Sequence, residues 1–305
     1  MSQRHPLPQL FAGILLWLGC ITSLTTDAAD ARPLLWRVAG PVPVYLFGTI
    51  HSAHPELNRL PESVSQAFDR ADSFYGELPL DGATQARAQT LFMLPPGQRL
   101  SDQLDRQHRQ RINRVLAAID PQLNLDTLNA LRLWAFTLTL ALLEDQLTYA
   151  GAPMMDLRLY QAATAQGKQT GGLETPEEQV AVFEQLDRDE QLALLDATLG
   201  YLEATHARDQ SSSADSYRIY REGDPNQFLA LFGEQMDVPL LLKLKLQRLL
   251  LNERNQRMAE RIDRLISANP QQRLFIAVGA AHFTDHGGVP SRLRERGYNV
   301  HRVEE

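Results

Sequence analysis

Two histidines follow the same short pattern at opposite ends of the chain. Residues 48–51 have the sequence GTIH and residues 279–282 have the sequence GAAH, so each histidine stands three positions after a glycine. An apolar run with strand character ends at each glycine, and glycine permits a sharp exit from a strand. A third run of this kind ends near an acidic residue, Glu77. His51, Glu77 and His282 are therefore the first candidates for a catalytic site.

Two imidazoles and one carboxylate form a ligand set that suits a divalent metal. Three protein ligands leave one position open for water, and the metal lowers the pKa of that water until it becomes a nucleophile at neutral pH. Imidazole suits zinc or cobalt, and a carboxylate extends the choice toward manganese. In an alternative arrangement, two of the three side chains bind the ion and the third acts as a general base. The spacing leaves both arrangements open.

The elements that must position these side chains are strands near the two ends of the chain. A helix signal after Pro61 lies between the first two strands, and a helix over residues 290–296 lies between the last two. Strand, helix and strand at this spacing are typical of a βαβ unit with parallel strands. Strand character is found at residues 44–47, 73–78, 274–278 and 298–303, and more weakly at 169–173.

The middle of the chain is predicted to be mostly helical. We therefore predict an α/β fold with a mostly parallel sheet, formed by the N- and C-terminal ends of the chain, and a large helical insertion at about 101–269. In such a sheet, ligands and catalytic groups gather at the carboxyl ends of the strands, where His51, Glu77 and His282 would meet. Apolar residues recur at helical spacing over residues 128–147, 154–165, 176–186 and 239–266.

Composition excludes several classes of protein. The chain has 305 residues, of which 44% are hydrophobic and 22% charged, as in globular proteins rather than disordered or fibrous ones. Its net charge is −7 and no basic stretch offsets this charge, which argues against nucleic acid as a partner. The HEXXH motif of zincin proteases and the GXSXG motif of serine hydrolases are absent. No segment after the N-terminal region is predicted to span a membrane.

The N-terminal residues 1–31 have the features of a secretory signal peptide. A basic start precedes a short apolar run at residues 11–24, and residues 29–31 (ADA) form a small-residue cleavage pattern. The run is short for a membrane span, which disfavours a retained anchor. Cys20 lacks most of a lipoprotein signature, which disfavours lipid anchoring. We therefore expect an exported protein, periplasmic or extracellular, with a cysteine-free mature domain over residues 32–305.

The motifs at both ends resemble those of the TraB/GumN family. Residues 45–51 (YLFGTIH), followed by Glu77, are similar to the opening of the family pattern, and residues 277–283 (AVGAAHF) are similar to its close. The resemblance extends from about residue 34 to residue 303. Shorter matches lie between the two ends, at Asp156, at residues 172–175 (GLET), at 220–224 (YREGD) and at 254–255 (RN).

The resemblance implies a metal-dependent hydrolase. The family is related to the Tiki proteases, which depend on manganese or cobalt, and the paired histidines with the glutamate are regarded as their active site. This implies central roles for His51, Glu77 and His282, and it makes Asp156 and Arg254 candidates, with Arg254 holding a carboxylate or an oxyanion. The chain departs from the family pattern at residue 76, a glycine where a branched apolar residue is usual, and at residue 79, a proline where aspartate is usual.

Two further polar residues are weaker candidates. Glu174 ends the weak strand at residues 169–173, but as an acid before Thr175 and a proline it could equally cap the next helix. His286 follows His282 by four positions, which would place both on one face of a helix, although the glycines at 287–288 argue against a helix there.

Three hypotheses of function remain at this stage. The first is an exported metal-dependent hydrolase, most plausibly a peptidase, that uses manganese or cobalt, with zinc as another choice, on a peptide or small-molecule substrate. The second is a metal-free, esterase-like hydrolase in which a histidine or Glu77 activates water. The third is a protein without catalytic activity that binds haem, a metal or a peptide.

Overall fold

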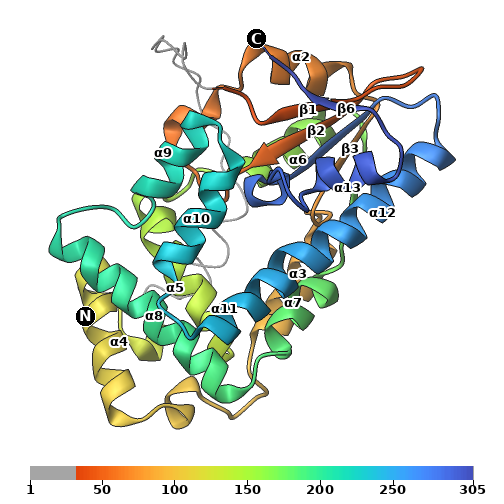
Figure 1. Ribbon diagram of the computed structural model, residues 1–305. Helices are drawn as coiled ribbons and strands as arrows, with labels where there is room; N and C mark the ends of the chain where they lie inside the picture. The colour runs from red at the N-terminus through yellow and green to blue at the C-terminus, as the bar shows by residue number, and fades with distance from the viewer. Residues whose placement is uncertain (1–31, 305) are drawn as a thin grey trace.

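A computed structural model describes residues 32–304, as one mixed sheet with helices on both faces and a helical layer beyond its edge (Figure 1). The predicted signal peptide and Cys20 lie outside the described residues. The strands are β1 (Leu35–Val38), β2 (Val44–Thr49), β3 (Ser73–Gly76), β4 (Gln169–Gly172), β5 (Leu274–Gly279) and β6 (Val300–Arg302). The α-helices are α2 (Glu62–Arg70), α3 (Gly82–Phe92), α4 (Arg106–Ile119), α5 (Leu133–Thr148), α6 (Met155–Ala165), α7 (Pro176–Glu184), α8 (Arg188–Ala207), α9 (Ala214–Glu222), α10 (Pro225–Gln235), α11 (Leu240–Gln247), α12 (Glu253–Ala268) and α13 (Val289–Glu295).

The sheet confirms the α/β class but corrects its predicted pairing. The strand order is β4-β3-β5-β2-β1-β6, in which β4, β3, β5 and β2 are parallel. The sequence did not predict β1, which pairs antiparallel with both β2 and β6, so the sheet is mixed rather than mostly parallel. The physical reason is the loop between β1 and β2, residues 39–43, which is too short for the crossover that a parallel pair requires.

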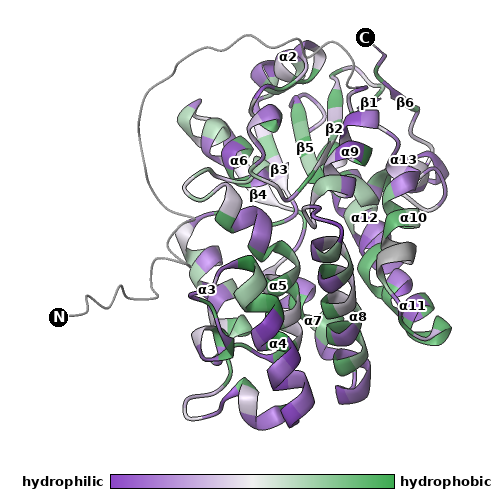
Figure 2. Cartoon of the chain, turned by 90° about the vertical axis from the view of Figure 1, so that its left-hand side faces the viewer, coloured by the Kyte–Doolittle hydropathy of each residue, from purple (hydrophilic) through white to green (hydrophobic). Residues whose placement is uncertain are grey.

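Both faces of the sheet are covered because neighbouring residues of its central strands are apolar. In β2, Leu46 packs in the cluster formed with α12 and α13, and Phe47 packs in the cluster formed with α2 and α6. Figure 2 shows the apolar β2 and β5 between these helix layers. The amphipathic helix α2 contributes Val64 and Phe68 to its face. Continuous burial on both sides is typical of parallel strands in α/β proteins.

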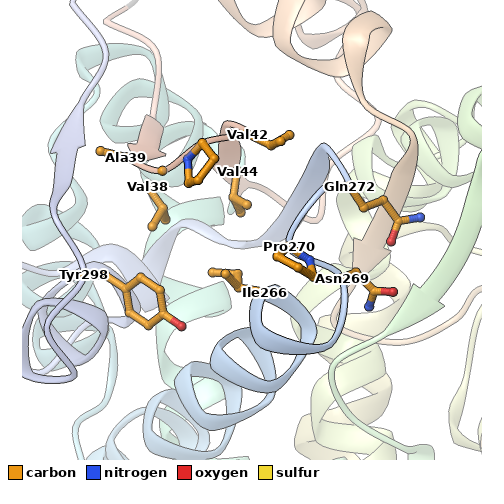
Figure 3. Close-up of a pocket in the computed structure, with 11 residues that line it drawn as sticks. Val38, Ala39, Val42, Val44, Ile266, Asn269, Pro270, Gln272 and Tyr298 are labelled. Atoms are coloured by element: carbon orange, nitrogen blue, oxygen red, sulfur yellow. The ribbon is translucent and has the colours of Figure 1, made fainter.

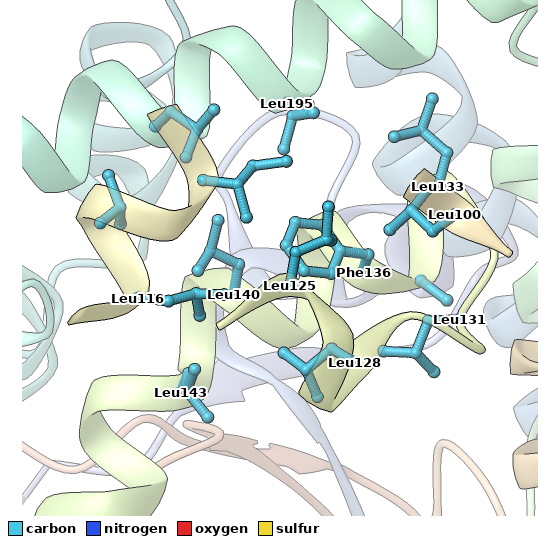
Figure 4. Close-up of a cluster of buried hydrophobic side chains, with 14 of the residues drawn as sticks. Leu100, Leu116, Leu125, Leu128, Leu131, Leu133, Phe136, Leu140, Leu143 and Leu195 are labelled. Atoms are coloured by element: carbon cyan, nitrogen blue, oxygen red, sulfur yellow. The ribbon is translucent and has the colours of Figure 1, made fainter. Parts of the chain in front are cut away.

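The helical layer has a hydrophobic core of its own, separate from the sheet. Helices α4, α5 and α8 pack around fully buried side chains such as Leu116, Phe136 and Leu195 (Figure 4). This layer lies within the predicted insertion at 101–269, but the same stretch also contributes β4 to the sheet. No described helix, in the part from residue 32 to residue 304, is long and apolar enough to cross a bilayer.

The helix predicted over residues 239–266 is interrupted by a π-helical turn. Helix α11 passes into the π-helical turn Arg248–Asn252 (η4), and α12 continues from it. A π-turn changes the rotational register of the helix, and such turns are common beside functional sites. Arg254 and Asn255 follow directly after this turn, and the next section shows where their side chains lie.

Candidate active site

The predicted meeting point of the three strands exists. The carboxyl ends of β2, β3 and β5 lie side by side, with Thr49 opposite Gly279 in the register and Tyr75 opposite Ile276. His51 follows β2 by two residues, and Glu77 follows β3 directly. His282 lies in the short 3-10 helix Ala280–Phe283 (η5) after β5.

The two motif glycines are required by close contacts rather than by unusual backbone angles. Neither glycine has a positive φ. A Cβ atom at Gly48 would stand 2.9 Å from the Cβ of Leu34 and 3.3 Å from the Cα of Ala280, which belongs to the other motif. A Cβ atom at Gly279 would stand 3.1 Å from the Glu77 carboxylate. The glycines therefore let the two motifs and the acid approach one another.

His51 is oriented by a carboxylate. Its Nδ1 lies 2.9 Å from Asp156 Oδ2, and the other oxygen of Asp156 accepts a hydrogen bond from the Thr49 hydroxyl at 2.5 Å. Asp156 stands in the first turn of α6, where the helix dipole favours a negative charge. The Asp156 carboxylate raises the pKa of His51 to about 9. With its Nδ1–H donated to Asp156, the His51 side chain, which is 52% exposed, has Nε2 left for other contacts.

His282 is oriented in the same way by an amide. Its Nδ1 lies 2.5 Å from Asn255 Oδ1, and the Asn255 amide nitrogen donates to the Gly287 carbonyl at 2.9 Å. Because the second bond fixes the amide, Asn255 presents an acceptor, and His282 carries its proton on Nδ1. Burial, followed by the charge of Arg254, lowers the pKa of His282 to about 3. The ring is therefore neutral, with a lone pair on Nε2.

Glu77 is held as an ionised carboxylate between the two histidines. Its Oε1 accepts a hydrogen bond from the Gly279 backbone N–H at 2.7 Å and lies 3.6 Å from His282 Nε2. Its Oε2 forms a 2.6 Å ion pair with Arg254 and accepts from Gln179 at 3.1 Å. Burial by itself favours the neutral acid, but the charge of Arg254, with smaller contributions from His51 and the Gly279 N–H, outweighs it and holds the pKa of Glu77 well below its usual range.

Glu174 anchors Arg254 from the opposite side. The Glu174 side chain is fully buried and contacts Arg254 through both Nε, at 3.1 Å, and Nη2, at 2.6 Å. Gln179 also donates to Glu174, at 3.2 Å, so it bridges the two acids. The helix-cap alternative for Glu174 is wrong, because the Thr175 hydroxyl caps α7. Arg254 is thus held between Glu77 and Glu174.

Four of these polar side chains face one pocket. His51, Glu77, Asp156 and Gln179 line a pocket of about 100 Å³ at the strand ends. A second pocket, of about 80 Å³, lies at the opposite end of the sheet between Val38 and Tyr298 (Figure 3), and none of the candidate residues lines it. His51 and Glu77 therefore reach the first pocket, whereas His282 is buried beside Glu77 and does not line it.

The donor chemistry of the site fits a divalent metal. Each histidine has Nδ1 held by an acceptor and Nε2 on the opposite side of the ring, which is the arrangement of histidines that ligate metals. Nε2 of neutral His282 carries a lone pair, whereas the raised pKa of His51 means that a metal would have to displace the proton from its Nε2. Glu77 Oε1 adds an anionic oxygen beside His282 Nε2. Within residues 32–304, however, no group of three or more histidine, cysteine or acidic residues is already gathered in metal-binding geometry. The assignment of His51, Glu77 and His282 as ligands therefore stays a prediction.

The other polar residues near the site either lie away from His51, Glu77 and His282 or hold the site in place. His286 is exposed in the turn after His282, where its carbonyl accepts from the Thr284 hydroxyl. Asn255 and Gln179 were not predicted from their types, because amides occur on many helix surfaces. Asn255 lies within the match at 254–255, which was the only signal for it in the sequence. Tyr220, whose hydroxyl donates to the Gly48 carbonyl at 2.8 Å, lay in another of these matches.

Comparison with known proteins places the whole fold in one family. The chain is similar to Metalloprotease TIKI2 of Danio rerio, with 30% identity over 89% of this chain and 61% of that protein. It is 27% identical to Metalloprotease TIKI1 of Homo sapiens over 91% of this chain and 63% of that protein. It is also 26% identical to the uncharacterized protein YbaP of Escherichia coli over 82% of this chain and 87% of that protein.

The chain spans about three fifths of the length of the Tiki proteins that it matches. No solved structure matches the chain. The family model of TraB, PrgY and gumN proteins matches residues 34–302, which include both histidine motifs, Glu77 and Arg254. This chain is a member of the TraB/PrgY/gumN family.

Proposed function

We propose that this protein is an exported metal-dependent hydrolase that cleaves peptides, with His51, Glu77 and His282 at its centre. The names of the Tiki relatives support a metalloprotease-like activity. The basic start, apolar run and ADA pattern at the N-terminus support export. Manganese and cobalt are the metals that the family resemblance favours, and zinc also suits the two imidazoles.

One observation in particular supports the metal. Asp156 and Asn255 come from different helices, yet each accepts the Nδ1 proton of one histidine at the same sheet edge. Metal ligation needs a fixed tautomer at each histidine, and outer partners of this kind are usual around metal sites. A general base also needs a fixed tautomer, but at one histidine rather than at both.

The residues around the ion would each have a separate task. His51 and His282 would hold it through Nε2, and it would lower the pKa of a bound water and polarise the peptide carbonyl. Glu77 would supply the third ligand, an oxygen, or accept the proton of the attacking water. The lowered pKa of Glu77 makes it a weak base, which favours the role of ligand. Arg254, anchored by Glu174, keeps Glu77 ionised and in place.

A metal-free hydrolase is the second candidate, and the His51–Asp156 pair favours it. An imidazole held by a carboxylate at 2.9 Å is a recurring general base in hydrolases. In this mechanism deprotonated His51 would take a proton from water through Nε2, and Asp156 would stabilise the imidazolium that forms. Because the pKa of His51 is about 9, this activity would rise as the pH rises toward that value.

Peptide hydrolysis with metal removal and return separates the two candidates. Purified protein is incubated with a mixture of peptides, and the products are identified by mass spectrometry, before and after chelator and after addition of manganese or cobalt. We expect cleavage that chelator abolishes and metal restores, and that His282→Ala lacks under all conditions. His301→Ala, a change of an exposed histidine in β6, is the matched control and should remain active. Cleavage that chelator leaves unchanged would favour the metal-free mechanism, and the absence of any cleavage would contradict both.

A further inference from the structure

The pocket beside Glu77 has a second wall whose chemistry the proposed reaction does not use. One part of the pocket lining, here called the polar wall, is formed by His51, Glu77, Asp156 and Gln179. The other part, the apolar wall, carries no charged or hydrogen-bonding side chain. Its residues are Phe74, Gly76, Leu78, Leu80 and Ala277.

This apolar wall is built partly from the rigid core of the sheet. Phe74 and Ala277 are each only 1% exposed, on the neighbouring strands β3 and β5. The Phe74 ring is fixed between other rings, with an edge contact to Phe68 at 6.1 Å and a stacked contact to Phe275 at 6.4 Å between centroids. Side chains packed in this way keep their positions, so this part of the wall has a fixed shape.

The rest of the wall is formed by the segment that follows β3. Leu78 and Leu80 are half-buried, and both line the pocket although no strand or helix contains them. Gly76 keeps the space between the sheet and this segment open. A Cβ atom at Gly76 would stand 3.0 Å from the Leu78 carbonyl oxygen and 3.8 Å from the Phe74 ring. The pocket thus depends on the missing side chain at residue 76.

The volume of the pocket limits what it can hold. It measures about 100 Å³, whereas an apolar cavity of about 150 Å³ is known to hold a benzene molecule. An aliphatic side chain of valine, leucine or methionine therefore fits better than the ring of phenylalanine or tryptophan. A charged side chain would lose its hydration against the apolar wall without gaining a partner there.

We propose that this wall is a specificity site for an aliphatic side chain of the substrate, on the residue adjoining the bond that is cleaved. The inference rests on the proposed peptidase function, because the polar wall of the same pocket contains His51 and Glu77. A side chain held by the apolar wall would lie in the same pocket that His51 and Glu77 line. Burial of a leucine side chain should favour binding about 10- to 100-fold over glycine.

A binding experiment tests the site without requiring catalysis. N-acetyl-leucine N-methylamide, and its glycine and phenylalanine counterparts, are titrated into the protein, and their dissociation constants are measured by ligand-observed NMR. We expect the leucine probe to bind at least about ten times more tightly than the glycine probe and more tightly than the phenylalanine probe. Leu80→Trp should fill the pocket and weaken binding of the leucine probe about tenfold or more. Leu80→Ala should enlarge it and improve binding of the phenylalanine probe.

The control is Leu241→Ala, which changes a leucine that is 82% exposed on α11 and should leave all three affinities as in the wild type. Equal affinities for the three probes, or a Leu80→Trp variant that is folded by circular dichroism and binds leucine normally, would overturn the proposal. The cleavage assay is run in parallel and reports separately on the proposed function. Selective leucine binding without peptide cleavage would support an aliphatic binding site in this pocket and contradict the peptidase function on which its substrate role rests. Cleavage without any aliphatic preference would support the peptidase and overturn the specificity site.

Discussion

Removal of the Asn255 side chain is the most informative single change at this site, because Asn255 reaches the candidate ligands through His282, and its other hydrogen bond goes to the Gly287 carbonyl. Its amide oxygen accepts the Nδ1 proton of His282 at 2.5 Å, and both residues are buried, with exposures of 1% and 3%. In Asn255→Ala, water has poor access to replace the lost acceptor. The Glu77 carboxylate, 3.6 Å from Nε2, then becomes the nearest acceptor for a proton on the ring. The imidazole is therefore expected to change tautomer and lose the lone pair that would bind a metal.

The magnitude follows from these contacts. A buried donor left without a partner costs about 1–3 kcal/mol of folding stability, and the loss of an outer partner of a metal ligand costs about 10- to 100-fold in metal affinity or activity. The assay is a manganese or cobalt titration by calorimetry, together with urea unfolding of the same preparations. We expect both quantities to fall in Asn255→Ala. Asn255→Asp keeps an acceptor oxygen at this position and should retain more of the metal affinity.

The matched control is Asn269→Ala, which changes an exposed asparagine at the end of the same helix and should leave metal affinity unchanged. The reasoning is refuted if Asn255→Ala loses folding stability while its metal affinity remains that of the wild type. In that case Asn255 would be a structural residue, and the tautomer of His282 would have no bearing on metal binding.

Three other predictions concern the supporting structure. Glu174→Gln removes one of the two acids that hold Arg254, and because Glu174 is buried we expect a loss of about 3 kcal/mol in urea unfolding; a loss below about 1 kcal/mol would contradict this. Arg261 beside Glu178 lowers the pKa of that carboxyl to about 2 from its ordinary value of 4.5. The ionised Glu178 carboxylate therefore contributes roughly 2 kcal/mol to folding stability, a contribution that is complete above pH 4.5 and is lost as the pH falls toward 2. As the pH is lowered, the urea midpoint should fall less steeply in Glu178→Gln than in the wild type. Leu116→Ala, in the core of the helical layer, should cost about 2–5 kcal/mol yet leave metal affinity unchanged, and a parallel loss of metal affinity would show that the layer and the site are coupled.

The part of the fold that the sequence predicted is the part with a strong local signal. Strands β2, β3 and β5 are apolar runs that end at chemically distinctive residues, and their parallel order follows from the helices between them. Strand β1 was missed because it has only four residues and an exposed arginine, Arg37, within it. The Gly40-Pro41 turn that follows it could have indicated a hairpin and hence an antiparallel pair.

The candidate site, like the fold, has parts that the local sequence indicates and parts that it does not. The common edge at which His51, Glu77 and His282 lie could be predicted because each stands one to three residues after a strand, so topology alone brings them there. The hydrogen bonds of Asp156 and Asn255 could not be found, because they depend on how helices α6 and α12 are rotated about their axes. For α12 the rotation depends on the π-helical turn Arg248–Asn252 that precedes it, and the spacing of apolar residues in the sequence did not indicate this turn.

Metal content is the most direct test of the central claim, that the two histidine motifs form one metal site. The protein and a His51→Ala, His282→Ala double variant are loaded with manganese or cobalt, dialysed to remove free ions, and analysed by elemental mass spectrometry. The account predicts about one ion per chain in the wild type and almost none in the double variant, with circular dichroism the same in both. Equal metal content in the two proteins would contradict it.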